Sequence, residues 1–462
     1  MTRSRIVMAA LATALGLSTS IAANSASART EQVRDVEIVQ QGEGGNPFYL
    51  AMAYNPEKDE FLVVYLNRFG SNDLSGVLLD RDGDVISGPN VLAIHTTAAP
   101  NSDGLISQQP PAVAYNPTTD QYAIAYVRSV GSNPGGGQAG HVVSRLVDDS
   151  GIAIGGEQLI TPDFGSYYFC QARFPDVAFD PASGGYVFAY FKHSFFQEGT
   201  CTDVPEDSTD RVLLQSASAD LVPGAIVPAA RGTDQGFPLL DVESAPDTGN
   251  VMVAAPVNDV DGAAFLYGPD RELVADIPLE QSDPAGIFSL AKVAHDPASG
   301  NWLITWRQNR TNETWGTVVD ADGDVVTPSG VIVPGHSVAG LSAAGDGTFV
   351  GVTADGSLLH LDADGQMLSL ESVDEMFTNG YNTQSRAGVR VSPSTPRVWS
   401  PSASTRRTRI SWSRRQTCSH RVRCHWSRLD SWRRVRVPSS PPSTDRPKAV
   451  GSGRPATWSP SR

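Results

Sequence analysis

One segment of the sequence recurs along most of its length. Residues 177–190 read VAFDPASGGYVFAY, and residues 293–306 read VAHDPASGNWLITW. Less exact copies of the same sequence occur at residues 51–65, 112–126 and 240–256. Each copy carries one proline, and successive prolines are 51 to 65 residues apart: Pro56, Pro117, Pro181, Pro246 and Pro297. A period of this length indicates a repeat architecture in which each unit is one small supersecondary structure.

Each repeat predicts four strands. The first strand ends in Asn-Pro or Asp-Pro, where the Asn or Asp side chain accepts hydrogen bonds from the local backbone and proline presets the turn. A strand with alternating apolar residues follows, as in 61–65. A third strand runs into an Asp-Gly hairpin turn, as in LLDRDGDVI (78–86) and VVDADGDVV (318–326), and a short fourth strand completes the unit.

We therefore expect an all-β fold, a β-propeller with six clear four-stranded blades and an incomplete seventh. The sixth blade starts at residue 341, where Asp346-Gly347 replaces the proline turn, and the seventh starts at AGVRVSPST (387–395). The segment DVEIVQQG (35–42) resembles a fourth strand, so we expect it to pair with the last blade and close the ring. A pair of β-sandwiches is the alternative fold.

The first blade reads EFLVVYLNR followed by SGVLLDRDGDVISGPNVLAI. This sequence resembles a repeat found in bacterial secreted β-propeller proteins. The resemblance covers residues 35–395 and implies the propeller fold without a particular activity. The chain departs from that pattern in the fourth blade, which lacks the Asp-Gly turn, and in the sixth, which lacks the proline.

The N-terminal residues have the pattern of an export signal. Arg3 and Arg5 precede an uncharged apolar run, and Ala26-Ser27-Ala28 offers a cleavage site. We expect a signal peptide over 1–28 and a secreted, periplasmic or extracellular protein with its propeller over 29–395. The alternative is an uncleaved membrane anchor, but the apolar run is short for a span.

Charge divides the chain into an acidic body and a basic end. Residues 1–389 carry 18 Lys and Arg against 48 Asp and Glu, whereas residues 390–462 carry 17 against 2. The acidic body disfavours nucleic acid and anionic membrane as partners, and we expect a monomer. Residues 396–462 are rich in Arg, Ser and Pro, so we expect disorder. We interpret them as a reading-frame product, with a basic binding tail and a linker as the alternatives.

Two loops of the third blade supply candidate binding residues. Cys170 and Cys201 are the cysteines of the body, and an oxidising compartment favours a disulfide between them, with two free thiols as the alternative. The same loops carry five aromatic residues that suit stacking on sugars or gripping peptides, or that instead form a small satellite core: Tyr167, Tyr168, Phe169, Phe195 and Phe196.

Three charged residues stand five positions before a marker proline, on strands expected to line the axial channel: Asp176, Asp241 and Lys292. They predict either a buried ion network or a site that binds a polar ligand or performs acid–base chemistry. The Asp-Gly turns raise calcium as a cofactor, with Asp80, Asp82 and Asp84 as candidate ligands, but a plain hairpin is favoured and we expect no cofactor. His295 replaces Tyr or Phe of other copies, which indicates packing.

Two classes of function are compatible with these features. The first is an exported, non-enzymatic propeller that binds a glycan or protein ligand on one face. The second is a polysaccharide hydrolase or lyase with acidic residues in the propeller channel. We favour binding, because no catalytic motif accompanies Asp176 and Asp241.

Overall fold

The computed structural model describes residues 47–372, with the exception of 68–72, 82, 96–108, 133–137, 162–169, 195–210, 232–239, 258–260, 280–287 and 309–310. The regular secondary structure of these residues consists of 24 strands. None of the described residues belongs to a helix long and apolar enough to cross a membrane.

The strands form six separate four-stranded antiparallel sheets, which are the blades of a six-bladed β-propeller. Blade 1 contains β1 (Pro47–Asn55), β2 (Glu60–Asn67), β3 (Asp73–Asp80) and β4 (Val85–His95). Blade 2 contains β5 (Ala112–Asn116), β6 (Gln121–Ser132), β7 (Gln138–Asp148) and β8 (Ala153–Leu159). Blade 3 contains β9 (Cys170–Asp180), β10 (Gly185–Ser194), β11 (Arg211–Ala217) and β12 (Pro223–Arg231).

Blades 4 to 6 repeat the same order of strands. Blade 4 contains β13 (Asp241–Ser244), β14 (Val251–Pro256), β15 (Gly262–Tyr267) and β16 (Leu273–Leu279). Blade 5 contains β17 (Phe288–Asp296), β18 (Asn301–Gln308), β19 (Glu313–Val319) and β20 (Val325–Val333). Blade 6 contains β21 (Val338–Ala343), β22 (Phe349–Thr353), β23 (Ser357–Leu361) and β24 (Met367–Ser372).

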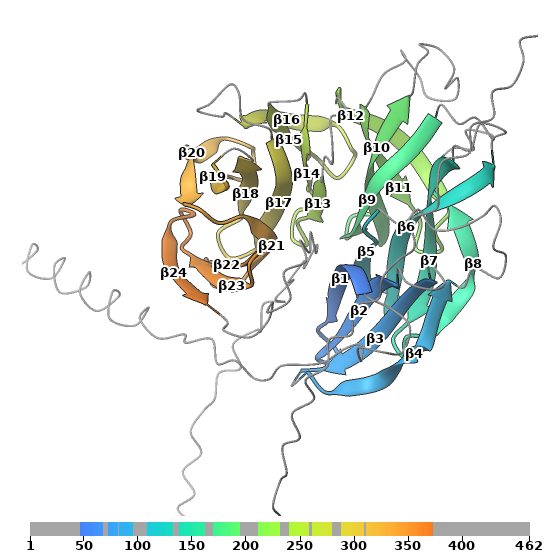
Figure 1. Cartoon of the computed structure of the whole chain (residues 1–462). Helices are drawn as coiled ribbons and strands as arrows, with labels where there is room; N and C mark the ends of the chain where they lie inside the picture. The colour runs from blue at the N-terminus through green and yellow to red at the C-terminus, as the bar shows by residue number, and fades with distance from the viewer. Residues whose placement is uncertain are drawn as a thin grey trace, which may run out of the picture. The chain divides into compact units, whose positions relative to one another are not determined.

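The first strand of every blade lies innermost and the fourth lies outermost (Figure 1). The predicted propeller and its six blades are therefore confirmed. The β-sandwich alternative is wrong because the six sheets follow one another with their first strands innermost, and each packs against the next in the series. The segments expected to form a seventh blade, 35–42 and 387–395, lie outside the described residues. So do the expected signal peptide (1–28) and the basic end (396–462).

The core lies between the blades, and the alternation of side chains along each strand builds it. In β6, Tyr122 and Ile124 pack against blade 1, whereas Ala123 and Ala125 pack against blade 3. All four side chains are fully buried. Successive residues of a strand point to opposite faces of its sheet, so a blade with apolar residues on both faces needs a neighbour on each side.

The turns after the first strands have the predicted Asn-Pro or Asp-Pro structure. The Asn116 side-chain oxygen accepts hydrogen bonds from the backbone N–H groups of Thr118 (2.9 Å) and Thr119 (3.3 Å). Its amide also donates to the carbonyl of Gly184 in blade 3 (2.9 Å), so the turn connects two blades. The last residue of these turns takes the left-handed conformation. Its φ is 54° at Asp120 in blade 2 and 70° at Gly184 in blade 3. That conformation is easiest for glycine and is tolerated by aspartate.

The turns between third and fourth strands are tight hairpins. The Asp320 carboxylate accepts hydrogen bonds from the backbone N–H groups of Asp322 (3.0 Å) and Asp324 (2.9 Å). Blade 4 lacks the Asp-Gly sequence, as expected, but keeps the backbone geometry of this turn. The N–H of Gly268 donates to the carbonyl of Glu272 (2.9 Å), as that of Asp320 does to Asp324 (3.0 Å), and Arg271 takes the left-handed place of the glycine with φ of 68°.

Candidate functional site

The inner strands enclose an axial pocket of about 50 Å³ that is open to solvent. Every blade contributes to its wall, which consists of Ala51, Met52, Pro111, Ala112, Val113, Asp176, Val177, Asp241, Glu243, Lys292, Val293 and Leu341. The three charged residues that the sequence placed at one level of the channel all line this pocket. Their common distance from the marker prolines therefore translated into a common position in space.

Asp241 joins blade 4 to blade 5 through both of its carboxylate oxygens. Oδ1 lies 2.7 Å from Nζ of Lys292, and Oδ2 accepts a hydrogen bond from the backbone N–H of Val293 at 2.9 Å. The Lys292 side chain is only 4% exposed, and that of Asp241 is 16% exposed. A charge-assisted bond this deeply buried is costly to break, because the remaining charge would have no partner.

Asp176 makes the corresponding connection one blade earlier. Its Oδ2 accepts a hydrogen bond from the backbone N–H of Val242 in β13, at 2.8 Å. Asp176 and Asp241 thus use the same geometry, in which a carboxylate on one inner strand accepts from the backbone of the next. The chemistry available here is a polar, partly charged wall whose carboxylates are engaged between blades.

Glu243 is a pocket residue that the sequence reasoning missed. It lies on β13 two positions after Asp241, so both side chains emerge on the same side of that strand. The alternation of side chains along DVES (241–244) is therefore the sequence signal that places Glu243 in the pocket. Glu243 stands three positions before Pro246, so it falls outside the spacing of five that Asp176, Asp241 and Lys292 share.

The candidate residues of the third blade's loops lie outside the described part of the chain. These are Tyr167, Tyr168, Phe169, Phe195, Phe196 and Cys201, together with the side chain of Cys170. The disulfide and the aromatic site therefore stay predictions. The strands that carry these loops are described, and Cys170 of β9 pairs with Ser194 of β10, so both loops leave blade 3 at the same end of its sheet.

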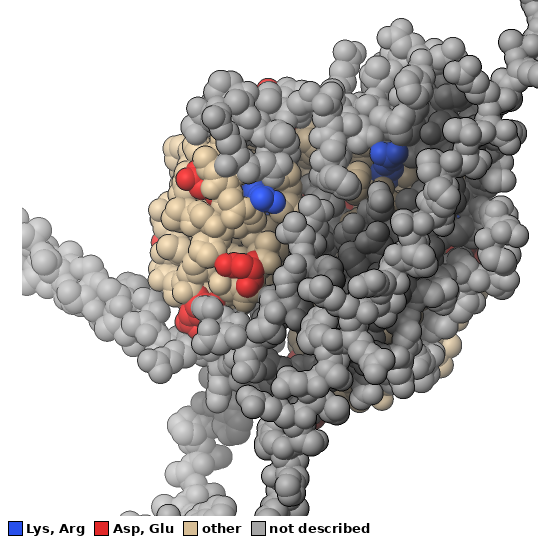
Figure 2. Space-filling view, viewed as in Figure 1, with Lys and Arg blue, Asp and Glu red and all other residues tan. Residues whose placement is uncertain are grey.

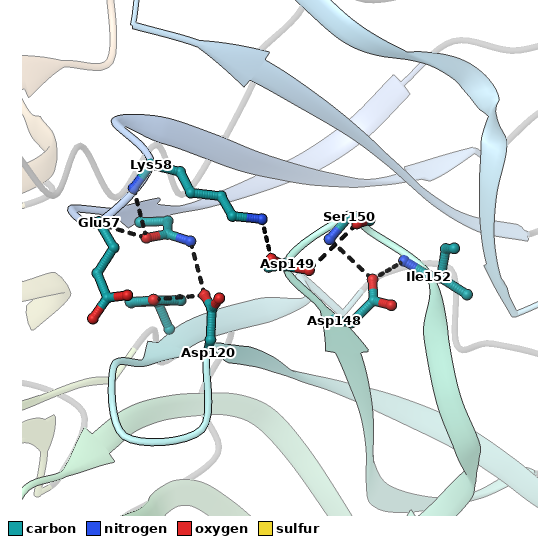
Figure 3. Close-up of polar contacts among 9 residues, drawn as sticks. Glu57, Lys58, Asp120, Asp148, Asp149, Ser150 and Ile152 are labelled. Carbon is teal, nitrogen blue, oxygen red and sulfur yellow. Dashed lines mark hydrogen bonds and ion pairs between the residues drawn. The ribbon is translucent and has the colours of Figure 1, made fainter.

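A second polar cluster joins blades 1 and 2 at their turns (Figure 3). The Lys58 ammonium bonds the Asp149 carboxylate, which raises the pKa of Lys58 and lowers that of Asp149. The Asn55 amide donates to Oδ1 of Asp120 (3.1 Å), which also accepts from the Tyr115 hydroxyl (2.8 Å). This cluster holds neighbouring turns together.

The hairpin turns have the geometry expected of plain turns. The Asp80 carboxylate accepts a hydrogen bond from the N–H of Asp84 (2.7 Å). The Asp148 carboxylate accepts from the N–H groups of Ser150 (3.0 Å) and Ile152 (2.7 Å), as Figure 3 shows. Among the described residues, no group of three or more His, Cys, Asp or Glu is arranged to hold a metal ion. Figure 2 shows small, separate acidic groups and one basic group on a largely uncharged surface over blades 5 and 6.

His295 has the packing role that the sequence indicated. Its ring lies 4.6 Å from that of Trp302, centroid to centroid, and its Nε2 is 3.7 Å from Oδ1 of Asp247. Burial lowers the pKa of His295, and this effect exceeds the opposing attraction of Asp247 and Asp296. The neutral imidazole is therefore the form that the fold favours.

Comparisons with known proteins found architectural likeness only. No family model matches the chain, and no curated protein matches it. Among solved structures, a periplasmic gluconolactonase of Pseudomonas aeruginosa is similar over 70% of this chain and 84% of its own, at 12% identity and a TM-score of 0.46. The Cps50 (Swd1) β-propeller domain of Myceliophteria thermophila is similar over 73% and 89%, at 10% and 0.40.

The Dos1 propeller is similar over 71% of this chain and 86% of its own, at 12% identity and a TM-score of 0.41. At 10–12% sequence identity, this similarity concerns the arrangement of blades alone. It does not indicate a function, because proteins of unrelated function share the propeller fold. The function has to be inferred from the residues of this chain.

We predict that Lys292→Met lowers the free energy of unfolding by about 3 kcal/mol, because it leaves the Asp241 carboxylate buried without its cation. Denaturant unfolding measures this effect. The matched control is Arg81→Met, which removes a cation that is 77% exposed and lies 3.4 Å from Asp59. The control should cost less than about 0.5 kcal/mol. Equal effects of the two substitutions would contradict the role given to Lys292.

We predict that His295→Phe makes stability less sensitive to acid. The folded protein binds a proton at His295 less readily than the unfolded chain, so the wild type loses stability as the pH falls below about 6.5. Phe179 occupies the equivalent place in blade 3 and shows that a phenyl ring is accommodated there. Melting temperatures of both proteins between pH 7.5 and 5 should diverge toward low pH, and parallel curves would show that His295 makes no such contribution.

Proposed function

We propose that this protein is an exported, non-enzymatic β-propeller that binds a glycan or protein ligand on one face. The observation that carries the proposal is the bonding of the charged groups in the axial pocket. Asp241 bonds Lys292 and the backbone of Val293, and Asp176 bonds the backbone of Val242. A general acid or base has to exchange a proton with its substrate, whereas these carboxylates join blades. Fixed polar groups in a concave wall suit the orientation of a polar ligand.

The binding face we propose is the end of blade 3 from which its two aromatic loops leave. The pairing of Cys170 with Ser194 supports this choice, because it starts both loops from adjacent points. Asp176 of the pocket lies six residues along β9 from Cys170, which is roughly 20 Å of extended strand. Loops on a rigid scaffold can hold Tyr167, Tyr168 and Phe196 for stacking on a sugar ring or gripping a peptide.

We also propose export and a relation to the secreted propeller repeats of bacteria. The N-terminal signal pattern over 1–28 and the text of the repeats support these two statements. In an oxidising compartment, Cys170 and Cys201 would be joined.

The experiment that tests binding uses the full chain and the triple variant Tyr167→Ala, Tyr168→Ala and Phe196→Ala. Both proteins are applied to a polysaccharide panel and a peptide array, and their melting temperatures are measured. We expect the triple variant to bind at least about tenfold more weakly, a loss of about 1.4 kcal/mol, with a nearly unchanged melting temperature.

The matched control is the triple variant Val222→Ala, Val325→Ala and Val331→Ala, which truncates three residues exposed elsewhere and should bind normally. A fall of several degrees in the melting temperature of the aromatic variant would contradict the site and indicate a buried satellite core. Release of reducing ends from a polysaccharide, lost in Asp241→Asn, would contradict the non-enzymatic assignment.

A further inference from the structure

The second strands show how each blade is covered by the one that follows it. Along these strands, every other residue points toward the next blade. In blades 1 to 5 that position is fully buried, at Leu62, Ala123, Val187, Met252 and Leu303. The equivalent residues of blade 6 are Val350 and Val352 of β22, which are only partly buried. Leu358, paired with Val352 on the same face, is partly buried as well.

The opposite end of the series has a matching feature in blade 1. Five hydrophobic clusters of the described residues each join neighbouring blades. The sixth cluster contains residues of blade 1 alone: Val63, Val77 and Leu79, with Leu50, Met52 and Phe61 packed against them. By the alternation, this is the face of blade 1 that points away from blade 2. Among the described residues, blades 6 and 1 thus share no cluster of the kind that joins the other neighbours.

The chain contains a segment whose pattern fits this position. Residues 388–393 read GVRVSP, and the corresponding text is AVAYNP in β5, DVAFDP in β9 and KVAHDP in β17. The residue four positions before the proline packs against the preceding blade in these strands, as Val113 and Val177 show. Val389 occupies that position in 387–395.

The connection to this segment is long enough. Residues 373–386 separate β24 from residue 387, and residues 96–111 separate β4 from β5 between blades 1 and 2. A connection of similar length therefore joins described neighbouring blades. The segment would be reached in the same direction around the axis as every earlier first strand.

We propose that residues 387–395 form the inner strand of a seventh sheet, which packs Val389 against Val350 and Val352 of blade 6. The other side of this strand faces Met52 of blade 1. Leu341 and Met52 both line the axial pocket, so the strand adds a wall element between them. A strand at this position buries apolar surface of blade 6 away from water. Burial of apolar surface is also what stabilises the packing of the other blades.

The test compares three variants of the full chain: Val352→Asp, Val389→Asp and the double variant. Each single substitution should lower the melting temperature by about 5 °C or more, because it places a carboxylate in a buried interface. The double variant should lose less than the sum, because either aspartate alone already displaces the strand from the face and leaves the second substitution no interface to disrupt. Val331→Asp is the control, since Val331 is 45% exposed on β20, and it should shift the melting temperature by at most about 1 °C.

Hydrogen exchange tests whether residues 387–395 occupy the face of blade 6 that carries Val350 and Val352. Protection of the amides of residues 389–391 comparable with that in β21 supports the proposal, and exchange within seconds overturns it. A fall in melting temperature for Val352→Asp but not for Val389→Asp also overturns it and assigns the face to another occupant. Light scattering then identifies a second copy of the chain if Val352→Asp converts a dimer to a monomer. If the aspartate variants fail to fold, Val352→Ala and Val389→Ala provide the same cycle.

Discussion

The structure depends on the burial of both faces of every sheet. Each blade carries apolar side chains on two faces because side chains alternate along a strand, and a single four-stranded sheet cannot cover either face itself. Tyr122 and Ala123, adjacent in β6, are fully buried against different neighbours. The repeated sequence is the consequence, since every blade has to match the blades before and after it. This constraint also explains why the two ends of the series are the places where the face pattern changes.

Polar bonds between blades add direction to this apolar packing. At the turns, Asn116 connects blade 2 to the carbonyl of Gly184 in blade 3. In the pocket, Asp176 and Asp241 each accept from the backbone of the next inner strand. A carboxylate can accept several hydrogen bonds at once, which suits it to this position between strands. The charged wall of the pocket is therefore first a product of the architecture and secondly a surface on which a ligand can be oriented.

Much of the fold was predictable because its signals are local. The Asn-Pro, Asp-Pro and Asp-Gly turns are encoded within a few residues, and counting from Pro181, Pro246 and Pro297 placed Asp176, Asp241 and Lys292 in one pocket. The partners of these residues were not predictable, because the backbone N–H groups of Val242 and Val293 are reached only through the relative position of two blades. Glu243 was predictable from its spacing to Asp241. The aromatic loops depend on contacts that a strand pattern does not encode.

The central claim is that the blades stabilise one another and do not fold as separate units. Differential scanning calorimetry of the full chain tests it most directly. If every blade needs its neighbours, the described blades unfold together, and the calorimetric enthalpy of the transition equals the van't Hoff enthalpy. Two or more separate transitions, or a calorimetric enthalpy several times the van't Hoff value, would show that blades unfold independently and would contradict the account.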